Sequence, residues 1–389
     1  MAVSRPGSNP KAERFHVLDS WRGICALCVV LFHARYNAPV LGLGFVRGSW
    51  QFVDFFFVLS GFVIAANYRA TLAVNEATPP RLTGGHFVWL RLARIYPLHL
   101  FMLLAFIAVE AAGSLALPGL RAWWTQPYEP SSILSNLLLV QSLGIHGHLS
   151  WNQPAWSIAT EFWCYLLFLI GVRTLGHRLE GWLVAVVMVA PLLLLIVTDY
   201  GINVTYDWGM LRNIYGFSLG VLCWAVWQRG PLQLTSKWAW TLIELATIAA
   251  VVAFVALSGV RPVTVLGPPL FAVAVLVFAH ARGALSKVLE MRFFLLLGTL
   301  SYSIYLIHTF ILARFRNGIT VFEHIFNTRL MVDVAPDSDK VRTLVGSNAT
   351  QGTLLLMLVV VLIIGASWLS YRLIERPAQK WLNARWPRD

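Results

Sequence analysis

Apolar residues in this chain gather into runs of about twenty positions, separated by polar segments. A helix of about twenty apolar residues has the length needed to cross the hydrocarbon core of a bilayer. The runs therefore predict ten membrane-spanning helices, and this even number returns the chain to the side from which it started. The ten expected spans are residues 17–36, 51–68, 87–112, 155–172, 181–198, 211–228, 238–258, 264–280, 293–313 and 353–371.

The composition agrees with this pattern, because 58% of the 389 residues are hydrophobic and only 12% are charged. The sequence thus predicts an all-α fold, a polytopic integral membrane bundle of helices. The first span carries Arg22 and His33 and lacks a cleavage site after its apolar run, so we expect it to stay in the mature protein. Three regions are expected: an N-terminal tail at 1–16, a transmembrane domain at 17–372 and a C-terminal tail at 373–389.

The positions of Lys and Arg predict the orientation, since cytoplasmic loops hold most of these residues. Both tails are basic, whereas the segment TDYGINVTYDW on the opposite side carries two Asp and no base. The bases after Ala313 conflict with this orientation, but long loops obey the rule poorly. We therefore expect both termini in the cytoplasm, and the compact bundle suits a bacterial inner membrane. The net charge of +12 does not indicate nucleic-acid binding, because the bases lie in short loops rather than on a soluble face.

Two long connections, 113–154 and 314–352, fall on the outer side and are the expected place for acceptor recognition. Within the first, the apolar segment SSILSNLLLVQSL is too short to span, so it predicts a re-entrant or interfacial helix; a loop packed on the bundle is the alternative. Aromatic residues in this loop suit a glycan acceptor, although anchoring at the membrane interface explains them equally well. They are Trp123, Trp124, Tyr128 and Trp151.

Arg22 and His33 are eleven positions apart in the first apolar run. At 100° per residue this spacing places both side chains on one helix face, about 16 Å apart along the axis. A charge and an imidazole are costly to bury in a membrane, so such residues are candidates for function. One extended ligand could contact both.

The other polar residues within the spans fall into two expected layers, because successive helices run in opposite directions. The inner layer is basic and comprises Arg22, Arg91, Arg94, Arg372 and Arg376. The outer layer is titratable and comprises His33, Asp54, Glu161, Arg212 and His308.

The two layers suit different chemistry. Arginines offer a planar fork of donors to phosphate oxygens, although anchoring of cytoplasmic loops explains most such bases. Imidazole and carboxylate groups suit proton transfer from a hydroxyl group, whereas pairing of Glu161 with a base such as Arg212 is the structural alternative. His99 and His280 are expected to be hydrogen-bonded core residues. Neither a metal site nor a disulfide framework is expected, since the four cysteines lie in apolar helices and pack there: Cys25, Cys28, Cys164 and Cys223.

Six segments, in order along nearly the whole chain, resemble the acyltransferase-3 family of integral membrane O-acyltransferases. LDSWRGICALCVVLFH matches the Arg-x10-His signature of the family at Arg22 and His33, and VDFFFVLSGFVIA resembles its second-helix motif. RLARIYPLHL resembles its basic turn before the third helix, and QPAWSIATEFWCYLLF its Trp-Ser-x-x-x-Glu segment, with Glu161 at the final position. SYSIYLIH, which ends at His308, and YRLIERPAQKW are similar to its last two motifs. Each fragment alone is weak, but six in the right order make a strong match.

The resemblance implies transfer of an acyl group, by default acetyl, from a cytoplasmic acyl-CoA to a hydroxyl group on the outer side. Acetyl-CoA would be a donor substrate rather than a permanently bound cofactor. The expected acceptor is a glycan or a lipid-linked sugar, and a small molecule such as a macrolide is the alternative. Arg22, Arg91 and Arg94 would hold the CoA phosphates. His33 would act as the general base and Glu161 would orient it, with an acyl-histidine intermediate as the competing mechanism.

Five further residues are supporting candidates by their place in the two layers or beside them: Asp19, Asp54, Arg212, His308 and Arg376. Family members that carry an additional esterase-like domain after the last span differ from this chain, so acceptor handling is expected from the bundle, its outer loops or a partner. The outer segment DVAPDSDK has no assignment.

A proton-coupled transporter is the rival hypothesis, because intramembrane His, Asp and Glu residues can carry a proton with a substrate. No inverted repeat is visible in the sequence, and the spacing of Arg22 and His33 covers two depths rather than the midplane. A non-catalytic scaffold is the third hypothesis. Acyl transfer by the pure protein distinguishes all three.

Overall fold

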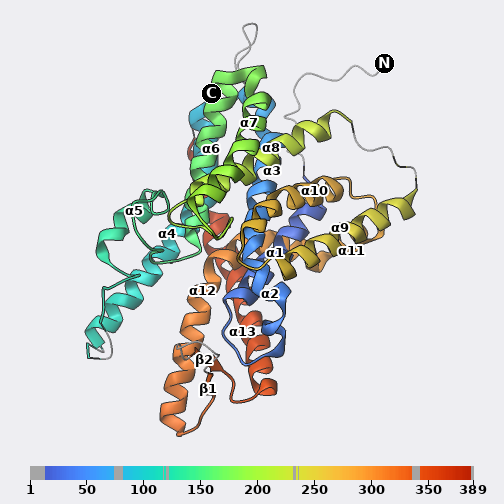
Figure 1. Cartoon of the computed structure of the whole chain (residues 1–389). Coiled ribbons are helices and arrows are strands. Elements are labelled where there is room, and N and C mark those ends of the chain that lie inside the picture. Colours follow the sequence, from blue (N-terminus) through green and yellow to red (C-terminus); the bar gives the residue numbers. More distant parts are fainter. Residues whose placement is uncertain are drawn as a thin grey trace.

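The computed structural model describes residues 14–73, 82–116, 118–119, 122–230, 234, 236–334 and 342–386. Within these residues a helix corresponds to each of the ten expected spans, and the all-α fold is confirmed (Figure 1). The ten helices are α1 (His16–His33), α3 (Phe52–Leu72), α4 (Gly84–Ala116), α6 (Ala155–Leu175), α7 (Leu179–Val197), α8 (Gly209–Gln228), α9 (Lys237–Ser258), α10 (Gly267–Ala279), α12 (Arg292–Phe326) and α13 (Ala349–Ser370).

Among the described residues, eight stretches are long and apolar enough to cross a membrane, and one of them, Ala155–Val197, contains both α6 and α7. Helix α8 is not one of the eight, and it carries Arg212 and Asn213, both buried. It packs against α3, α7 and α10 inside the bundle. The protein is therefore an integral membrane bundle in which a long helix with buried polar residues packs against apolar ones.

Glycines allow two helix pairs to approach until their backbones touch. A Cβ atom on Gly220 of α8 would lie 1.9 Å from the carbonyl oxygen of Val58, and one on Gly61 of α3 would lie 2.0 Å from that of Phe217. Between α1 and α12, a Cβ on Gly23 would lie 2.4 Å from the carbonyl carbon of Leu297. Small residues at such crossings are the usual means of close packing between membrane helices. Gly61 and Gly220 therefore allow close packing of α3 against α8, and Gly23 that of α1 against α12.

The outer segment 314–352 is more ordered than a loop. Helix α12 continues thirteen residues beyond its expected end at residue 313, as far as Phe326, and two short antiparallel strands follow, β1 (Met331–Val334) and β2 (Arg342–Val345). Together with the start of α13 they form an extension at one end of the molecule (Figure 1). The expectation of a long loop was wrong because hydropathy locates where a helix leaves the bilayer, not where it ends. The DVAPDSDK segment lies mostly outside the described residues.

The other outer connection contains a helix of only five residues, α5 (Ile133–Leu137). Two hydrogen bonds join it to α4: a ring nitrogen of His99 lies 2.9 Å from the carbonyl oxygen of Asn136, and Tyr96 donates to that of Leu137 at 3.0 Å. The segment is therefore a short turn packed on the bundle rather than a re-entrant helix. Trp124 packs edge-on and Tyr128 at a tilt against Trp151, which is 1% exposed. They consequently serve packing.

The remaining short elements connect the long helices. They are α2 (Gly44–Gly48), α11 (Ala284–Leu289), α14 (Arg376–Arg385), a π-helical turn Tyr371–Glu375 and 3₁₀ turns at Pro39–Gly42, Ser49–Gln51, Pro130–Ser132, Gly176–Arg178 and Pro262–Leu266. The starts of α1, α4 and α12 meet the end of the chain on one side: Ser20 donates to the Leu289 carbonyl at 2.6 Å, and Trp89 to that of Leu382 at 2.9 Å. The first and last described helices thus begin and end on the same side. Its assignment to the cytoplasm stays a prediction.

Candidate active site

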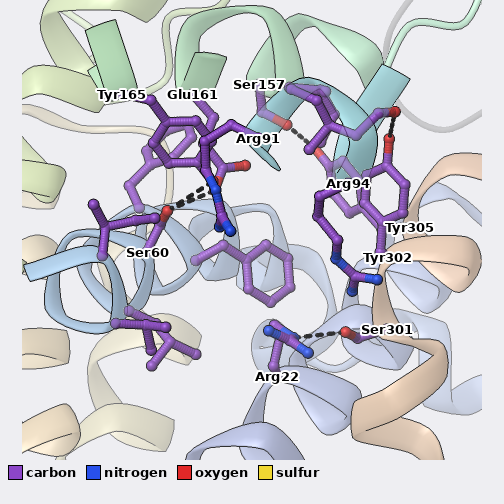
Figure 2. A pocket seen from close by; sticks show the side chains of 17 residues that line it. Arg22, Ser60, Arg91, Arg94, Ser157, Glu161, Tyr165, Ser301, Tyr302 and Tyr305 are labelled. Carbon is purple, nitrogen blue, oxygen red and sulfur yellow. Dashed lines mark hydrogen bonds between the residues drawn. The ribbon is translucent and has the colours of Figure 1, made fainter. Parts of the chain in front are cut away.

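A cavity of about 160 Å³ lies where α1, α3, α4, α6 and α12 converge. Its polar lining is drawn from segments far apart in the sequence, as Figure 2 shows. The polar and charged side chains that line it are Arg22, Ser60, Arg91, Arg94, Ser157, Glu161, Tyr165, Ser301, Tyr302 and Tyr305. The three arginines of the expected donor site therefore face one space, whose wall is supplied by five helices.

Each arginine is held by a different partner. Arg22 donates from Nε to Ser301 Oγ at 2.7 Å and from Nη2 to the Gly298 carbonyl at 3.1 Å, where the α1–α12 crossing brings that backbone close. Arg91 donates to the hydroxyl of Tyr68 at 2.6 Å, and its guanidinium carbon lies 4.7 Å from the centre of that ring. The partners of Arg91 are a hydroxyl group and an aromatic ring, which carry no negative charge, whereas Arg22 also forms an ion pair with Asp19 at 3.4 Å.

Arg94 has a buried carboxylate partner. It forms an ion pair with Glu375, whose side chain is only 1% exposed and whose other oxygen accepts from Ser303 at 2.9 Å. Glu375 lies at the end of the π-helical turn after α13. The ion pair therefore joins the end of the membrane domain to α4 and α12 beside the cavity.

Glu161 lies in the cavity wall with the arginines. Ser60 Oγ donates to its carboxylate at 2.6 Å, and the hydroxyl of Tyr165 donates to the same oxygen. Figure 2 shows this group on the side of the cavity next to Arg91. The expected placement of Glu161 in an outer layer beside His33 was wrong, because residue 161 is six positions, about 9 Å, inside α6 and faces Ser60 of α3.

His33 ends α1 and contacts a second histidine. Its Nδ1 lies 2.9 Å from the Val29 carbonyl oxygen and 3.2 Å from Nε2 of His308 on α12. His308 is fully buried, whereas His33 is partly exposed. The two histidines that the sequence assigned to the outer layer therefore form a pair, which we call the histidine pair.

Tyr305 connects the cavity with the histidine pair. Its ring lines the cavity and its centre lies 6.0 Å from that of His308, while its hydroxyl is 2.8 Å from Ser157 Oγ. Phe56, also in the cavity wall, packs edge-on against Tyr305 at 5.7 Å. These two aromatic side chains stand between the arginine-lined cavity and the histidines.

A comparison with protein families matches residues 15–372 to the acyltransferase-3 model, an acyltransferase domain. The chain belongs to the acyltransferase-3 family. It is 27% identical over 370 residues to acyltransferase MdmB of Streptomyces mycarofaciens, across 86% of this chain and 82% of that protein. It is also 32% identical over 173 residues to protein 2 in the picA locus of Rhizobium radiobacter, across 40% of this chain and 80% of that protein. No solved structure matches the chain.

Membership of the acyltransferase-3 family makes the protein a membrane acyltransferase that transfers groups other than aminoacyl groups. The family match covers every long helix, so the cavity and the histidine pair both lie within the acyltransferase domain. Among the described residues there is no group of three or more His, Cys, Asp or Glu side chains that could hold a metal ion. The chemical groups that the described site offers are the arginines, the carboxylates and the histidines.

Asp54 and Arg212 form an ion pair with each other. Arg212 donates from Nε and Nη2 to the two Asp54 oxygens at 2.9 and 2.7 Å and from Nη1 to the Val204 carbonyl at 3.0 Å. Trp50 and Trp156 lie 5.3 and 5.2 Å from its guanidinium carbon. Arg212 therefore does not pair with Glu161, which was the structural alternative. Its donors face protein atoms, as expected of a structural pair within this acyltransferase.

The two remaining supporting candidates, Asp19 and Arg376, do not line the cavity. Asp19 accepts from Arg14 at 3.2 Å and lies 3.4 Å from Arg22, so it borders the cavity arginine without lining the cavity. Arg376 is exposed at the start of α14, while the preceding Glu375 is buried. Arg376 stays a prediction, and the structure adds Glu375 of the same Glu-Arg-Pro motif as the partner of Arg94.

Sequence analysis missed several residues of the acyltransferase cavity. Tyr302 and Tyr305 are spaced three apart in SYSIYLIH, which places them on one helix face, and this signal could have indicated their role. Glu375 is the only carboxylate between residues 340 and 388, a second usable signal. Nothing in the sequence distinguishes Ser60 or Tyr165 from other polar residues in apolar helices.

Proposed function

We propose that this acyltransferase moves an acyl group, by expectation acetyl, from cytoplasmic acyl-CoA to a hydroxyl group of an extracytoplasmic or lipid-linked glycan. The observation that carries the proposal is the convergence of Arg22, Arg91 and Arg94 on one cavity whose wall includes Tyr305, the neighbour of His308 in the histidine pair. Arginine forks suit the phosphates of CoA, and an imidazole suits deprotonation of a hydroxyl group. The acyl group and the acceptor are part of the proposal.

In the proposed step His33 acts as the general base. As the acceptor oxygen attacks the thioester carbonyl carbon, its proton passes to the unprotonated ring nitrogen of His33. A tetrahedral intermediate forms, the bond between carbon and sulfur breaks, and the proton passes from His33 to the departing thiolate. The products are the ester and the free CoA thiol, and His33 returns to its neutral form.

Glu161 takes a binding role in this scheme. Both of its hydrogen bonds among the described residues go to Oε1, from Ser60 and Tyr165. An ionised carboxylate has about four acceptor sites. Its Oε2 is thus suited to accept an N–H or O–H group of the donor between the arginines and the histidine pair.

The test is acyl transfer in membranes that contain the wild type, Arg22→Ala or His33→Ala, supplied with radiolabelled acetyl-CoA. Label is followed into extracted glycan and lipid. Arg173→Ala is the matched control, because Arg173 is an exposed arginine of α6 outside the cavity. We expect roughly 10²- to 10⁴-fold slower transfer by His33→Ala, as for loss of a general base. Arg22→Ala should weaken donor binding by about tenfold or more, as for loss of charged hydrogen bonds.

Normal transfer by folded His33→Ala would remove His33 from the mechanism. Equal effects of Arg22→Ala and Arg173→Ala would remove the cavity from donor binding. If the wild type transfers label to lipid or a small molecule and none to glycan, the acceptor class is wrong while the reaction stands. No transfer from several acyl-CoA donors by folded wild type would refute acyl-CoA as the donor.

A further inference from the structure

The two rings of the histidine pair have a defined relative position. The ring centres lie 4.9 Å apart at an interplanar angle of 54°, and His33 Nδ1 is 3.2 Å from His308 Nε2. The pair joins α1 to α12, the two helices that touch at Gly23. The packing of α1 against α12 therefore holds the two rings beside each other.

The hydrogen-bond partners determine which ring nitrogens carry hydrogen. Nδ1 of His308 lies 2.7 Å from the Tyr305 carbonyl oxygen and 3.2 Å from that of Ile304. Carbonyl oxygens only accept, so this nitrogen carries the hydrogen, and Nε2 of a neutral His308 carries a lone pair. His33 Nδ1 then faces two acceptors, this lone pair and the Val29 carbonyl oxygen at 2.9 Å. Nδ1 of His33 must therefore be the protonated nitrogen, and its lone pair is on Nε2.

We propose that His308 is the positioning residue for His33. It accepts from Nδ1–H and so keeps the Nε2 lone pair of His33 available to the acceptor hydroxyl group. When His33 takes the proton of the acceptor, both nitrogens become donors, and His308 Nε2 still accepts from Nδ1. The hydrogen bond then stabilises a charged ring and becomes stronger. This inference rests on the proposed function of His33 and replaces Glu161 as the group that orients it.

Other candidates for this positioning role have different partners in the described part of the chain. Glu161 accepts from Ser60 and Tyr165, and Asp54 is the carboxylate of the Arg212 ion pair. Asn152 has an amide side chain that contacts α12. It donates to the Leu306 carbonyl and accepts from Thr309. His308 and the backbone at Val29 are thus the groups that the structure provides to His33.

Two substitutions separate positioning from support of the fold. His308→Gln can place an amide oxygen near the position of Nε2 and restore an acceptor, whereas His308→Leu keeps bulk and removes the acceptor. His280→Leu is the matched control, since His280 is also a ring on a membrane helix, bonded to the Leu276 carbonyl and stacked on Trp240 away from the pair. Each purified variant is checked by gel filtration and thermal unfolding in detergent. Steady-state rates are then measured with varied donor and acceptor.

We expect His308→Leu to lower kcat about 10- to 100-fold, the range for a lost hydrogen bond to a group that becomes charged. The KM for the donor should stay within about twofold of the wild-type value, because the cavity arginines are unchanged. His308→Gln should recover most of the lost kcat, and His280→Leu should match the wild type. Equal kcat in His308→Leu and wild type, or equal losses in both His308 variants that fold, would overturn the proposal.

A spectroscopic measurement tests the same proposal without activity. ¹⁵N NMR of histidine-labelled protein in nanodiscs, with the His33 signals assigned by their loss in His33→Gln, reports which nitrogen is protonated. The wild type should show Nδ1–H and a bare Nε2 on His33, and His308→Leu should show a mixture. The opposite tautomer in the wild type would refute the positioning role. If the expected tautomer occurs while His33→Ala transfers normally, the proposed function of His33 fails instead.

Discussion

Separating the Asp54–Arg212 ion pair should destabilise the protein strongly. The two side chains are 0% and 2% exposed, and two of the hydrogen bonds of the guanidinium go to the carboxylate. If Asp54 is replaced by Leu, the guanidinium retains the Val204 carbonyl and the faces of two tryptophans. If Arg212 is replaced by Met, a buried carboxylate loses its cation. Each single substitution thus leaves a charge in a place that water does not reach.

The expected cost of either single substitution is several kcal/mol. Two opposite charges about 4 Å apart attract by about 4 kcal/mol at an effective dielectric constant of 20. Removal of one partner from a buried pair costs about 3–5 kcal/mol, whereas replacement of both by apolar residues is often neutral or stabilising. We therefore expect Asp54→Leu and Arg212→Met each to lower the free energy of unfolding by this amount. The double variant should recover most of the lost stability.

Thermal unfolding of the four proteins in nanodiscs provides the double-mutant cycle, with gel filtration as a check on aggregation. The reasoning is refuted if the two single losses add in the double variant, because additive losses mean that the pair has no coupling energy. Acyl transfer is measured on the same samples. If the double variant is stable and transfers the acyl group normally, the ion pair has a structural role alone. If it is stable but inactive, Asp54 or Arg212 takes part in the reaction.

Three further outcomes follow from the cavity and the helix crossings. Arg91→Lys keeps the charge but loses the planar fork of guanidinium donors, so the KM for the donor should rise about tenfold in steady-state kinetics. An unchanged KM would contradict contact between Arg91 and the donor. Glu375→Gln should lower unfolding stability by about 1–3 kcal/mol, since Arg94 loses its carboxylate; an unaltered melting temperature contradicts this. Gly220→Ala should lower the free energy of unfolding by about 1–3 kcal/mol, because a Cβ there would lie 1.9 Å from a backbone oxygen. Gly365→Ala is the control and should leave stability unchanged, since a Cβ there would have no atom within 4 Å. Equal melting temperatures of the two variants would contradict this.

The sequence predicted the helices well because apolar runs report directly on membrane crossing. It also selected Arg22, Arg91 and Arg94, which share one cavity, and His33 and His308, which form a pair. These successes have a common cause. Charged and imidazole groups are so costly in a membrane that their presence alone indicates a role or a partner.

The partners themselves could not be predicted. Asp54 and Arg212 are 158 positions apart, and their pairing depends on α8 lying against α3, which hydropathy does not report. Glu375 faces the cavity region because a π-helical turn precedes α14, and such a turn changes the helical face that a period of 3.6 residues predicts. Glu161 was assigned to the wrong depth since span boundaries are uncertain by several residues, and the two expected layers lie only about 16 Å, or three helical turns, apart.

The contact between α1 and α12 holds the two ends of the proposed donor site, Arg22 and His33, at a fixed separation. Arg22 is fixed by the Gly298 carbonyl and Ser301, and His33 by His308, so the same two helices hold the phosphate-binding end and the base. Their separation along α1, about 16 Å, is set by helix rise and cannot change with loop movement. In the proposed reaction this helix pair is a molecular ruler. It would select donors by the length between anionic group and reactive carbon, independently of how tightly either end binds.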